Sequence, residues 1–143
     1  MTNTLQSAIE AIQDKILTIA GVKNAPDSPP GSTGGSYPFV LTVSAGGVWE
    51  FGVAGEKLGL HNIRVEMHFP LTMLSWTVEK LMAYSDSVPN VLMADPTLNG
   101  TVSTYGRIRY DFGPLGGDLG YMGIKTIGFA WTLEDVKMRS NAS

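Results

Sequence analysis

The 143-residue chain has no cysteine, so neither a disulfide nor a thiolate metal site can form within it. No apolar run approaches the roughly 20 residues needed to cross a bilayer, and the first residues lack the basic start and apolar core of a signal peptide. Lys and Arg are few and scattered, and the net charge is −3. Because nucleic-acid binding needs clustered cations, we expect no sequence-specific nucleic acid as partner. Because no run is long enough to span a bilayer, we also expect no membrane partner.

Length and composition are those of one domain. The chain is 43% hydrophobic, enough for one packed core, and its glycines and prolines gather in a few stretches. We therefore expect one domain over residues 1–143, with a long flexible loop at 24–37 and a polar, frayed C-terminal tail at 137–143. The loop reads equally as a linker or as an arm that orders against a neighbouring subunit.

Two helices are predicted from apolar spacing. Leu5, Ile9, Ile12, Ile16 and Ile19 recur every three or four residues, as on one face of an α-helix. A second helix is expected over about 71–85, with a short helical continuation at 88–94.

Five strands are predicted from alternation. Residues 38–45 and 48–53 form a hairpin through Gly46-Gly47, and 63–69 alternates cleanly before Pro70. Two more strands are expected at 101–110 and 121–133. The order α-β-β-β-α-β-β favours an α+β fold, a mainly antiparallel sheet with both helices on one face.

No complete catalytic or metal site is visible in the sequence. Arg64, Glu66 and His68 share one side of the 63–69 strand, whereas alternation puts His61 on the other side. Two ligands beside a cation make a poor metal site, so we predict a solvated polar face, no cofactor and no enzyme activity. A ligand-binding or hydrolytic site on this face is the less favoured alternative. Tyr37 and Trp49 flank loops, either as the edge of the core or as anchors for a partner.

The 95–102 turn, Asp95-Pro96-Thr97-Leu98-Asn99-Gly100-Thr101-Val102, is the most informative stretch. Pro96 stops the preceding helix, Asn99-Gly100 tolerates positive φ, and the β-branched pair that follows favours a strand. Helix, turn and strand are thus expected within a few residues.

The order of elements, the Leu-rich second helix, the 95–102 turn and the strand starting Tyr121-Met122-Gly123-Ile124 resemble the tail terminator and tail-completion (neck) proteins of long-tailed bacteriophages. The resemblance covers about residues 5–136. It implies a non-enzymatic virion protein, assembled in the host cytoplasm, whose ring, usually a hexamer, caps the tail tube, ends tube polymerisation and offers the head-joining surface.

The partners implied are other copies of the chain, the major tail tube protein and a head completion or connector protein, with DNA passing through the lumen. A head-side neck adaptor or a minor tail protein of the same fold is the alternative. The candidate interface residues are Tyr37, Trp49, Arg64, Glu66 and His68.

Overall fold

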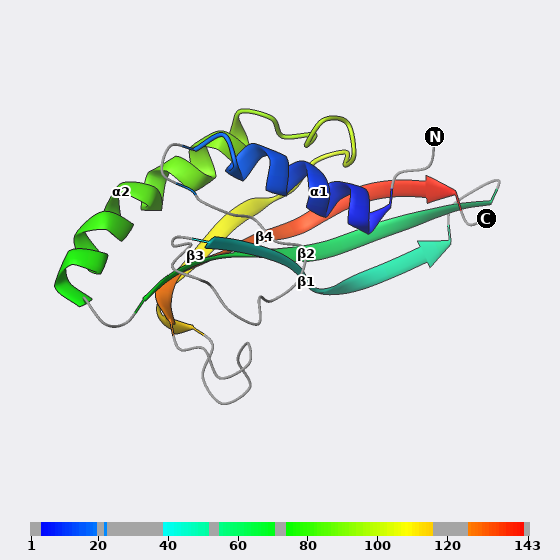
Figure 1. Ribbon diagram of the computed structural model, residues 1–143. Helices are drawn as coiled ribbons and strands as arrows, with labels where there is room; N and C mark the ends of the chain where they lie inside the picture. The colour runs from blue at the N-terminus through cyan, green and yellow to red at the C-terminus, as the bar shows by residue number, and fades with distance from the viewer. Residues whose placement is uncertain are drawn as a thin grey trace.

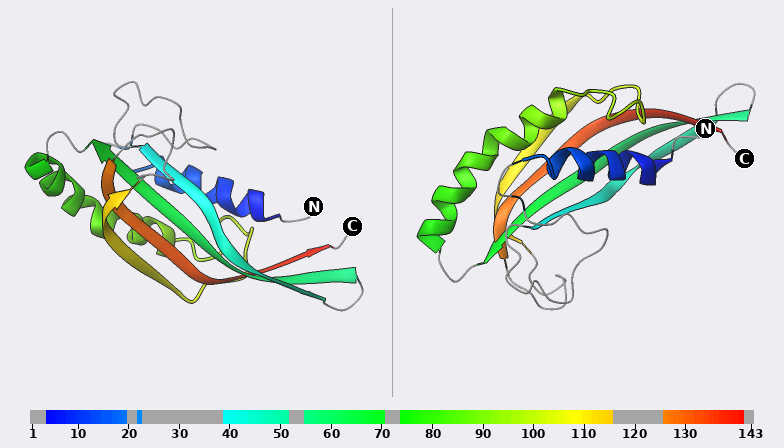
Figure 2. Two further views of the ribbon diagram at one scale, coloured as in Figure 1. Left: turned by 90° about the horizontal axis from the view of Figure 1, so that it is seen from below. Right: turned by 45° about the horizontal axis from the view of Figure 1, so that its top comes forward.

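A computed structural model describes residues 4–19, 22, 39–51, 55–70, 74–115 and 126–141. Its elements, in chain order, are α1 (Leu5–Ile16), β1 (Phe39–Phe51), β2 (Glu56–Pro70), α2 (Leu74–Met93), β3 (Arg107–Leu115) and β4 (Thr126–Asn141). The four strands form one antiparallel sheet in the order β1-β2-β4-β3. Both helices lie over the same face of this sheet, as Figure 1 and the two views of Figure 2 show. The predicted α+β fold is therefore confirmed.

Helix α1 begins where its sequence can satisfy the first backbone N–H groups. The Thr4 hydroxyl accepts a hydrogen bond from the Ser7 backbone N–H, and the Ser7 hydroxyl oxygen accepts one from the Thr4 N–H. Of the predicted face, Ile12 and Ile16 are fully buried, and Leu5, Ile9 and Ile19 pack partly buried against the core. This face packs on the sheet, which supplies stability that so short a helix lacks alone.

The predicted hairpin at Gly46-Gly47 is wrong. The chain continues through these glycines as the single strand β1, so the described residues form four strands where five were expected. The pairing of β1 with β2 shifts between Ser44 and Gly47, and Gly46 has φ +100°. Glycine allows this conformation in a β-bulge as readily as in a turn, and that is why the same dipeptide misled the sequence reading.

The second helix is continuous where we expected two pieces. Pro89 lies inside α2, although proline removes one helical hydrogen bond. Val88 and Leu92 on either side of it are fully buried in the core, and the Ser87 hydroxyl donates to the Ala83 carbonyl one turn earlier. Tertiary packing of this turn therefore outweighs the local preference of proline.

The last strands are displaced from their predicted ranges. Val102 is buried in a turn segment, and β3 begins only at Arg107. The frayed tail expected at 137–143 is wrong up to Asn141, because β4 extends to that residue and pairs with β2, and residues 142–143 lie outside the described residues. The pairing register between β4 and β2 shifts around Asp135, which has φ +58°. The buried residues that follow one another along β4 there, Leu133, Val136 and Met138, are therefore not evenly spaced by two.

The core lies between the helices and the sheet. Ile63, Val65, Met67 and Phe69 are buried on the helix-covered face of β2, as predicted. The neighbouring strand adds three further large side chains, with two aromatic rings stacked at 5.2 Å. These residues are Phe129, Trp131 and Leu133.

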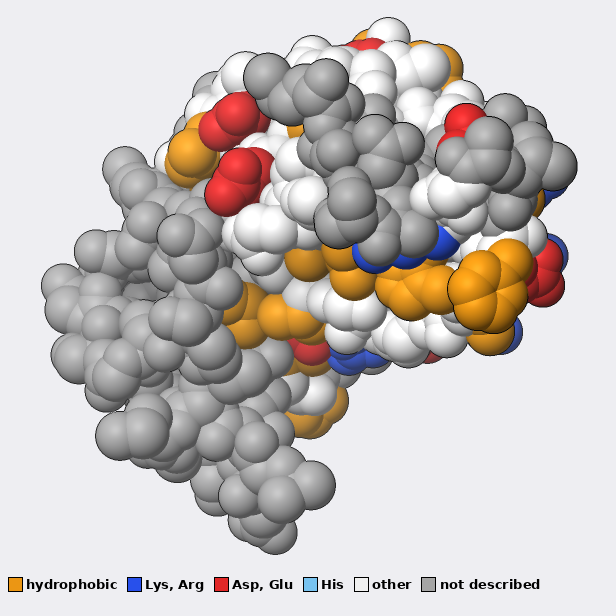
Figure 3. Space-filling model, turned by 90° about the vertical axis from the view of Figure 1, so that its right-hand side faces the viewer, with side chains coloured by type: hydrophobic (Ala, Val, Ile, Leu, Met, Phe, Trp, Pro, Cys, Tyr) orange, Lys and Arg blue, Asp and Glu red, His pale blue; other side chains and the backbone are white. Residues whose placement is uncertain are grey.

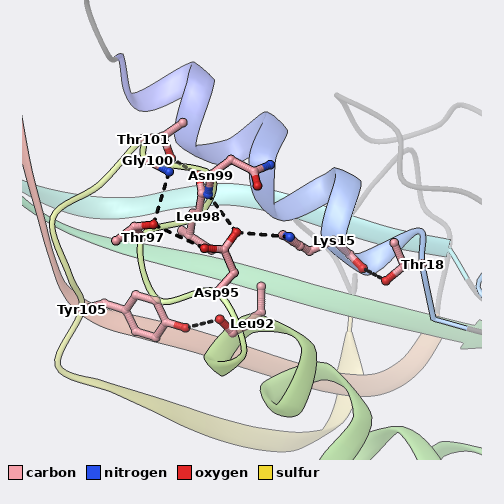
Figure 4. Close-up of polar contacts among 10 residues, drawn as sticks. All are labelled: Lys15, Thr18, Leu92, Asp95, Thr97, Leu98, Asn99, Gly100, Thr101 and Tyr105. Atoms are coloured by element: carbon pink, nitrogen blue, oxygen red, sulfur yellow. Dashed lines mark hydrogen bonds and ion pairs between the residues drawn. The ribbon is translucent and has the colours of Figure 1, made fainter.

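The 95–102 turn joins α2 to this core by its own hydrogen bonds. Leu98, Asn99 and Gly100 have φ of +50°, +60° and +78°, so the predicted turn is confirmed at Asn99-Gly100. Asp95 Oδ2 accepts from the Asn99 N–H at 2.9 Å and lies 3.2 Å from Lys15 Nζ on α1 (Figure 4). Buried Leu98 is thereby held against the core in a conformation that a branched side chain rarely adopts.

These contacts also shift two pKa values. The Asn99 N–H, followed by the Lys15 ammonium, lowers the pKa of Asp95. Burial, with the nearby Asp95 charge, raises the pKa of Tyr105, whose hydroxyl donates to the Leu92 carbonyl at 2.6 Å. The end of α2 is thus tied to the segment that leads into β3.

Candidate interaction surfaces

The structure does not bring the predicted interface residues together. Trp49 lies on β1, an outer strand, and is 43% exposed. Arg64, Glu66 and His68 lie on β2, an inner strand, well away from it. Tyr37 and the whole 24–37 loop lie outside the described residues.

Arg64, Glu66 and His68 form a row on the sheet face away from the helices. Arg64 Nε donates to Glu66 Oε2 at 2.6 Å, and His68 Nε2 lies 3.0 Å from Glu66 Oε1. Both carboxylate oxygens are therefore engaged by neighbours two residues away. His68 has no exposed surface and Glu66 is buried, so the predicted solvated face is wrong at these two positions.

Alternation identifies which side chains share a face but not whether that face is covered. Leu41 and Ala130, the residues directly opposite Glu66 on the flanking strands, are buried as well. A buried carboxylate held between a guanidinium and an imidazole has its charge and hydrogen-bonding needs met locally. The geometry is that of a structural ion pair with restricted solvent access.

His61 belongs to a different cluster. The imidazole of His61 packs edge-on against the indole of Trp49, with ring centroids 4.3 Å apart. Lys57 Nζ lies over the same indole, 4.3 Å from its centroid. Gly59, directly opposite Trp49, leaves the space that both rings occupy, since a Cβ there would come within 2.6 Å of the indole. Burial, then the Lys57 charge, lowers the pKa of His61. Within the described residues, no group of three or more His, Asp or Glu side chains could hold a metal.

Exposed apolar side chains mark both outer strands. On β1, Phe51 is 99% exposed and Val48 is more than half exposed. On β3, Tyr110 is 63% exposed and Phe112 is also exposed. Figure 3, which looks along the sheet toward the ends of β1, β2 and β4, shows hydrophobic side chains gathered on that end beside Lys and Arg.

The sequence reading missed all four of these residues, three of which are aromatic: Phe51, Tyr110 and Phe112. Their alternation with polar neighbours is visible, but alternation alone does not separate a core face from an exposed strand edge. The order of strands supplies the missing fact. Among the described residues, no strand pairs with the outer side of β1 or of β3.

A groove lies at the end of the sheet formed by the last residues of β1 and β4 and the first residues of β2. It has a volume of about 370 Å³, and its wall includes Val48 and Glu50 from β1, Leu58 and Leu60 from β2, and Lys137 from β4. One acidic and one basic side chain thus flank an apolar floor. The basic character increases toward β3, where Arg107 and Arg109 are both exposed and share the single carboxylate of Glu134, at 2.5 Å and 3.6 Å.

These surfaces define an α+β domain in which both outer strands carry exposed aromatic side chains and, within the described part of the chain, have an unpaired edge. Neither a protein-family model nor a curated protein matches the chain. Neither α1 nor α2, in the ranges described, is both long and apolar enough to cross a membrane.

Proposed function

We propose that this chain is a structural virion protein, the tail terminator subunit of a long-tailed bacteriophage. In this role its ring caps the tail tube, stops tube polymerisation and offers the surface to which the head joins. The proposal combines the resemblance stated above with the surfaces that the fold exposes. The ring is expected to hold six copies, as in the proteins that the chain resembles.

The observation that carries the proposal is the exposure of aromatic side chains on both outer strands. An unpaired edge is a template for pairing with another chain, and exposed apolar side chains along it favour such a contact. Here Phe51 and Tyr110 are left in solvent at opposite edges. Two different unpaired edges on one subunit suit a heterologous contact, in which one surface of a copy binds a different surface of the next copy. Such contacts form a ring when the rotation between neighbouring copies closes on itself.

The buried ion-pair row supports a structural role over a catalytic one. A general acid or base must come within hydrogen-bond reach of its substrate. His68 is fully buried and its Nε2 faces Glu66, so its described contacts serve the sheet. Net charge of −3 is compatible with DNA moving through a ring without being gripped.

The experiment is to add the purified chain to polymerising major tail tube protein and image the products by negative-stain electron microscopy. The proposal expects rings at tube ends and a shorter, narrower distribution of tube lengths as the chain is titrated in. Tubes of unchanged length with bare ends would overturn it.

The alternative function, a head-side neck adaptor, can be distinguished by testing whether the chain binds heads instead of tubes. Binding to connector-bearing heads in the absence of tubes, together with no effect on tube length, would move the chain to the head side.

A further inference from the structure

We propose that neighbouring copies of this chain join through the outer edge of β1 in one copy and the outer edge of β3 in the next, as one continuous antiparallel sheet. This inference rests on the proposed function and adds the contact by which the ring is built. The occupant of each open edge is thus a second copy of the chain.

Strand direction permits this junction. Every neighbouring pair in the order β1-β2-β4-β3 is antiparallel, so β1 and β3 run in opposite directions. A rotation that sets β3 of one copy beside β1 of the next therefore continues the antiparallel pattern. Backbone N–H and C=O groups on the two outer sides can then complete a ladder.

The side chains sort onto matching faces. Trp49 shares a face with buried His61, and Tyr110 pairs with Trp131, so both aromatic rings lie on the helix-covered side of the sheet. Glu50 and Arg109 both lie on the opposite side. The charges of the two strands are complementary as well. The one charged residue of β1 is acidic, whereas β3 has two arginines and one aspartate.

One register satisfies both faces. With Glu50 opposite Arg109, Trp49 lies opposite Tyr110 and Phe51 lies opposite Ile108. A shift of two residues one way sets Glu50 against Asp111, a repulsive pair. A shift of two residues the other way sets Glu50 against Arg107, but it replaces the Trp49–Tyr110 pair with Trp49–Ile108 and sets Val48 against Arg109. A shift of one residue turns aromatic faces toward charged ones. We therefore assign the register that pairs Glu50 with Arg109.

This register also gives neighbouring copies a stagger. Trp49 is level with Gly59 on β2, whereas Tyr110 is level, through Trp131, with Val65, six residues away along β2. At a rise of about 3.3 Å per residue this offset is roughly 20 Å, for about 19 Å across four strands. Strands would incline by roughly 45°, close to the roughly 35–45° by which strands tilt when a sheet closes on itself.

Paired cysteines test the junction cleanly, because the chain has none of its own. Val48 and Asp111 are both exposed and lie opposite each other in the assigned register. Within one copy they lie on the two outer strands, separated by β2 and β4, so a disulfide can form only between copies. The double variant Val48→Cys/Asp111→Cys should give a ladder of cross-linked species on a non-reducing gel after mild oxidation.

Three controls define the result. Val48→Cys alone and Asp111→Cys alone should stay monomeric on the gel, and Val48→Cys/Phe112→Cys should give no ladder because Phe112 lies on the other face. Dimers from either single variant would show two-fold pairing of like edges and overturn the proposal. A double variant without a ladder overturns it too, whether the wild-type chain is oligomeric or monomeric in light scattering.

Charge reversal gives a second readout. Glu50→Arg should weaken self-association by at least about tenfold in light scattering, whereas Glu79→Arg, an exposed acidic position on α2, should leave it unchanged. Equal behaviour of the two variants contradicts the assigned register. If the double cysteine variant gives the ladder but the protein never caps tubes, the proposed junction stands and the proposed function is wrong. If the protein forms rings on tubes but the double variant gives no ladder, the proposed function stands and the proposed junction is wrong.

Discussion

The indole of Trp49 packs edge-on against the imidazole of His61 above Gly59, in the strand pair that reaches the free end of the sheet. This cluster holds one face of Trp49 against the protein and leaves the rest of it exposed. It links the stability of the β1–β2 end to the surface that we propose for assembly.

Gly59→Ala should destabilise the fold by about 1–2 kcal/mol and increase the exposure of an indole. The added Cβ would lie within 2.4 Å of His61 Nε2 and 2.6 Å of Trp49, so one ring must move. Urea unfolding and Trp fluorescence measure the two effects. Gly106→Ala is the matched control, because its Cβ would meet its neighbours at 3.4 Å or more; equal costs would contradict the explanation.

Stability should fall as the pH is lowered through the mid-sixes because of His61. Its folded pKa is lowered by burial and Lys57, so the unfolded chain binds a proton first and the free energy of unfolding decreases from about pH 6.5 downward. Urea midpoints between pH 7.5 and 5.5 measure the slope. His61→Gln should flatten it; a variant with the wild-type slope would show that another group is responsible. The carboxylate of Asp95, with its lowered pKa, acts only nearer pH 4.

Glu66→Ala should be among the most damaging single changes, at about 2–3 kcal/mol. It removes the carboxylate that both Arg64 and fully buried His68 contact. Glu66→Gln keeps the shape and should cost less. Thermal unfolding of both variants gives the comparison, and a loss under about 0.5 kcal/mol for Glu66→Ala would show that the row is dispensable.

Asp95→Ala should cost about 1 kcal/mol or somewhat more, whereas Lys15→Met should cost little. The first change removes the acceptor for the Asn99 N–H together with the ion pair, and the second removes only a partly exposed ion pair. Chemical denaturation measures both. Equal losses would mean that the contact to α1, and not the turn, is what Asp95 provides.

Phe51→Ser should leave the monomer as stable as the wild type and reduce self-association and tube capping. Phe51 is 99% exposed, so the single copy gains almost nothing from its ring, whereas an assembled edge would bury it. Light scattering and tube-length measurements test this together. Met82→Ser, which removes an exposed apolar side chain from α2, is the control and should be neutral in both.

What the sequence determined by itself was local. The apolar spacing of α1, the alternation of 63–69 and the Asn99-Gly100 turn all follow from the periods of helix and strand and from backbone sterics. These preferences act within a few residues, and they were sufficient to predict the α+β class with both helices on one face.

The tertiary structure decided what lies next to what. Gly46-Gly47 became a bulge, Pro89 stayed inside α2, and β4 ran on to Asn141 because partners distant in sequence supplied pairing and burial. It also placed His68 in the interior and Phe51 in solvent. Alternation reports the side of a strand that a residue occupies, but burial and edge position depend on the strands and helices that pack beside it.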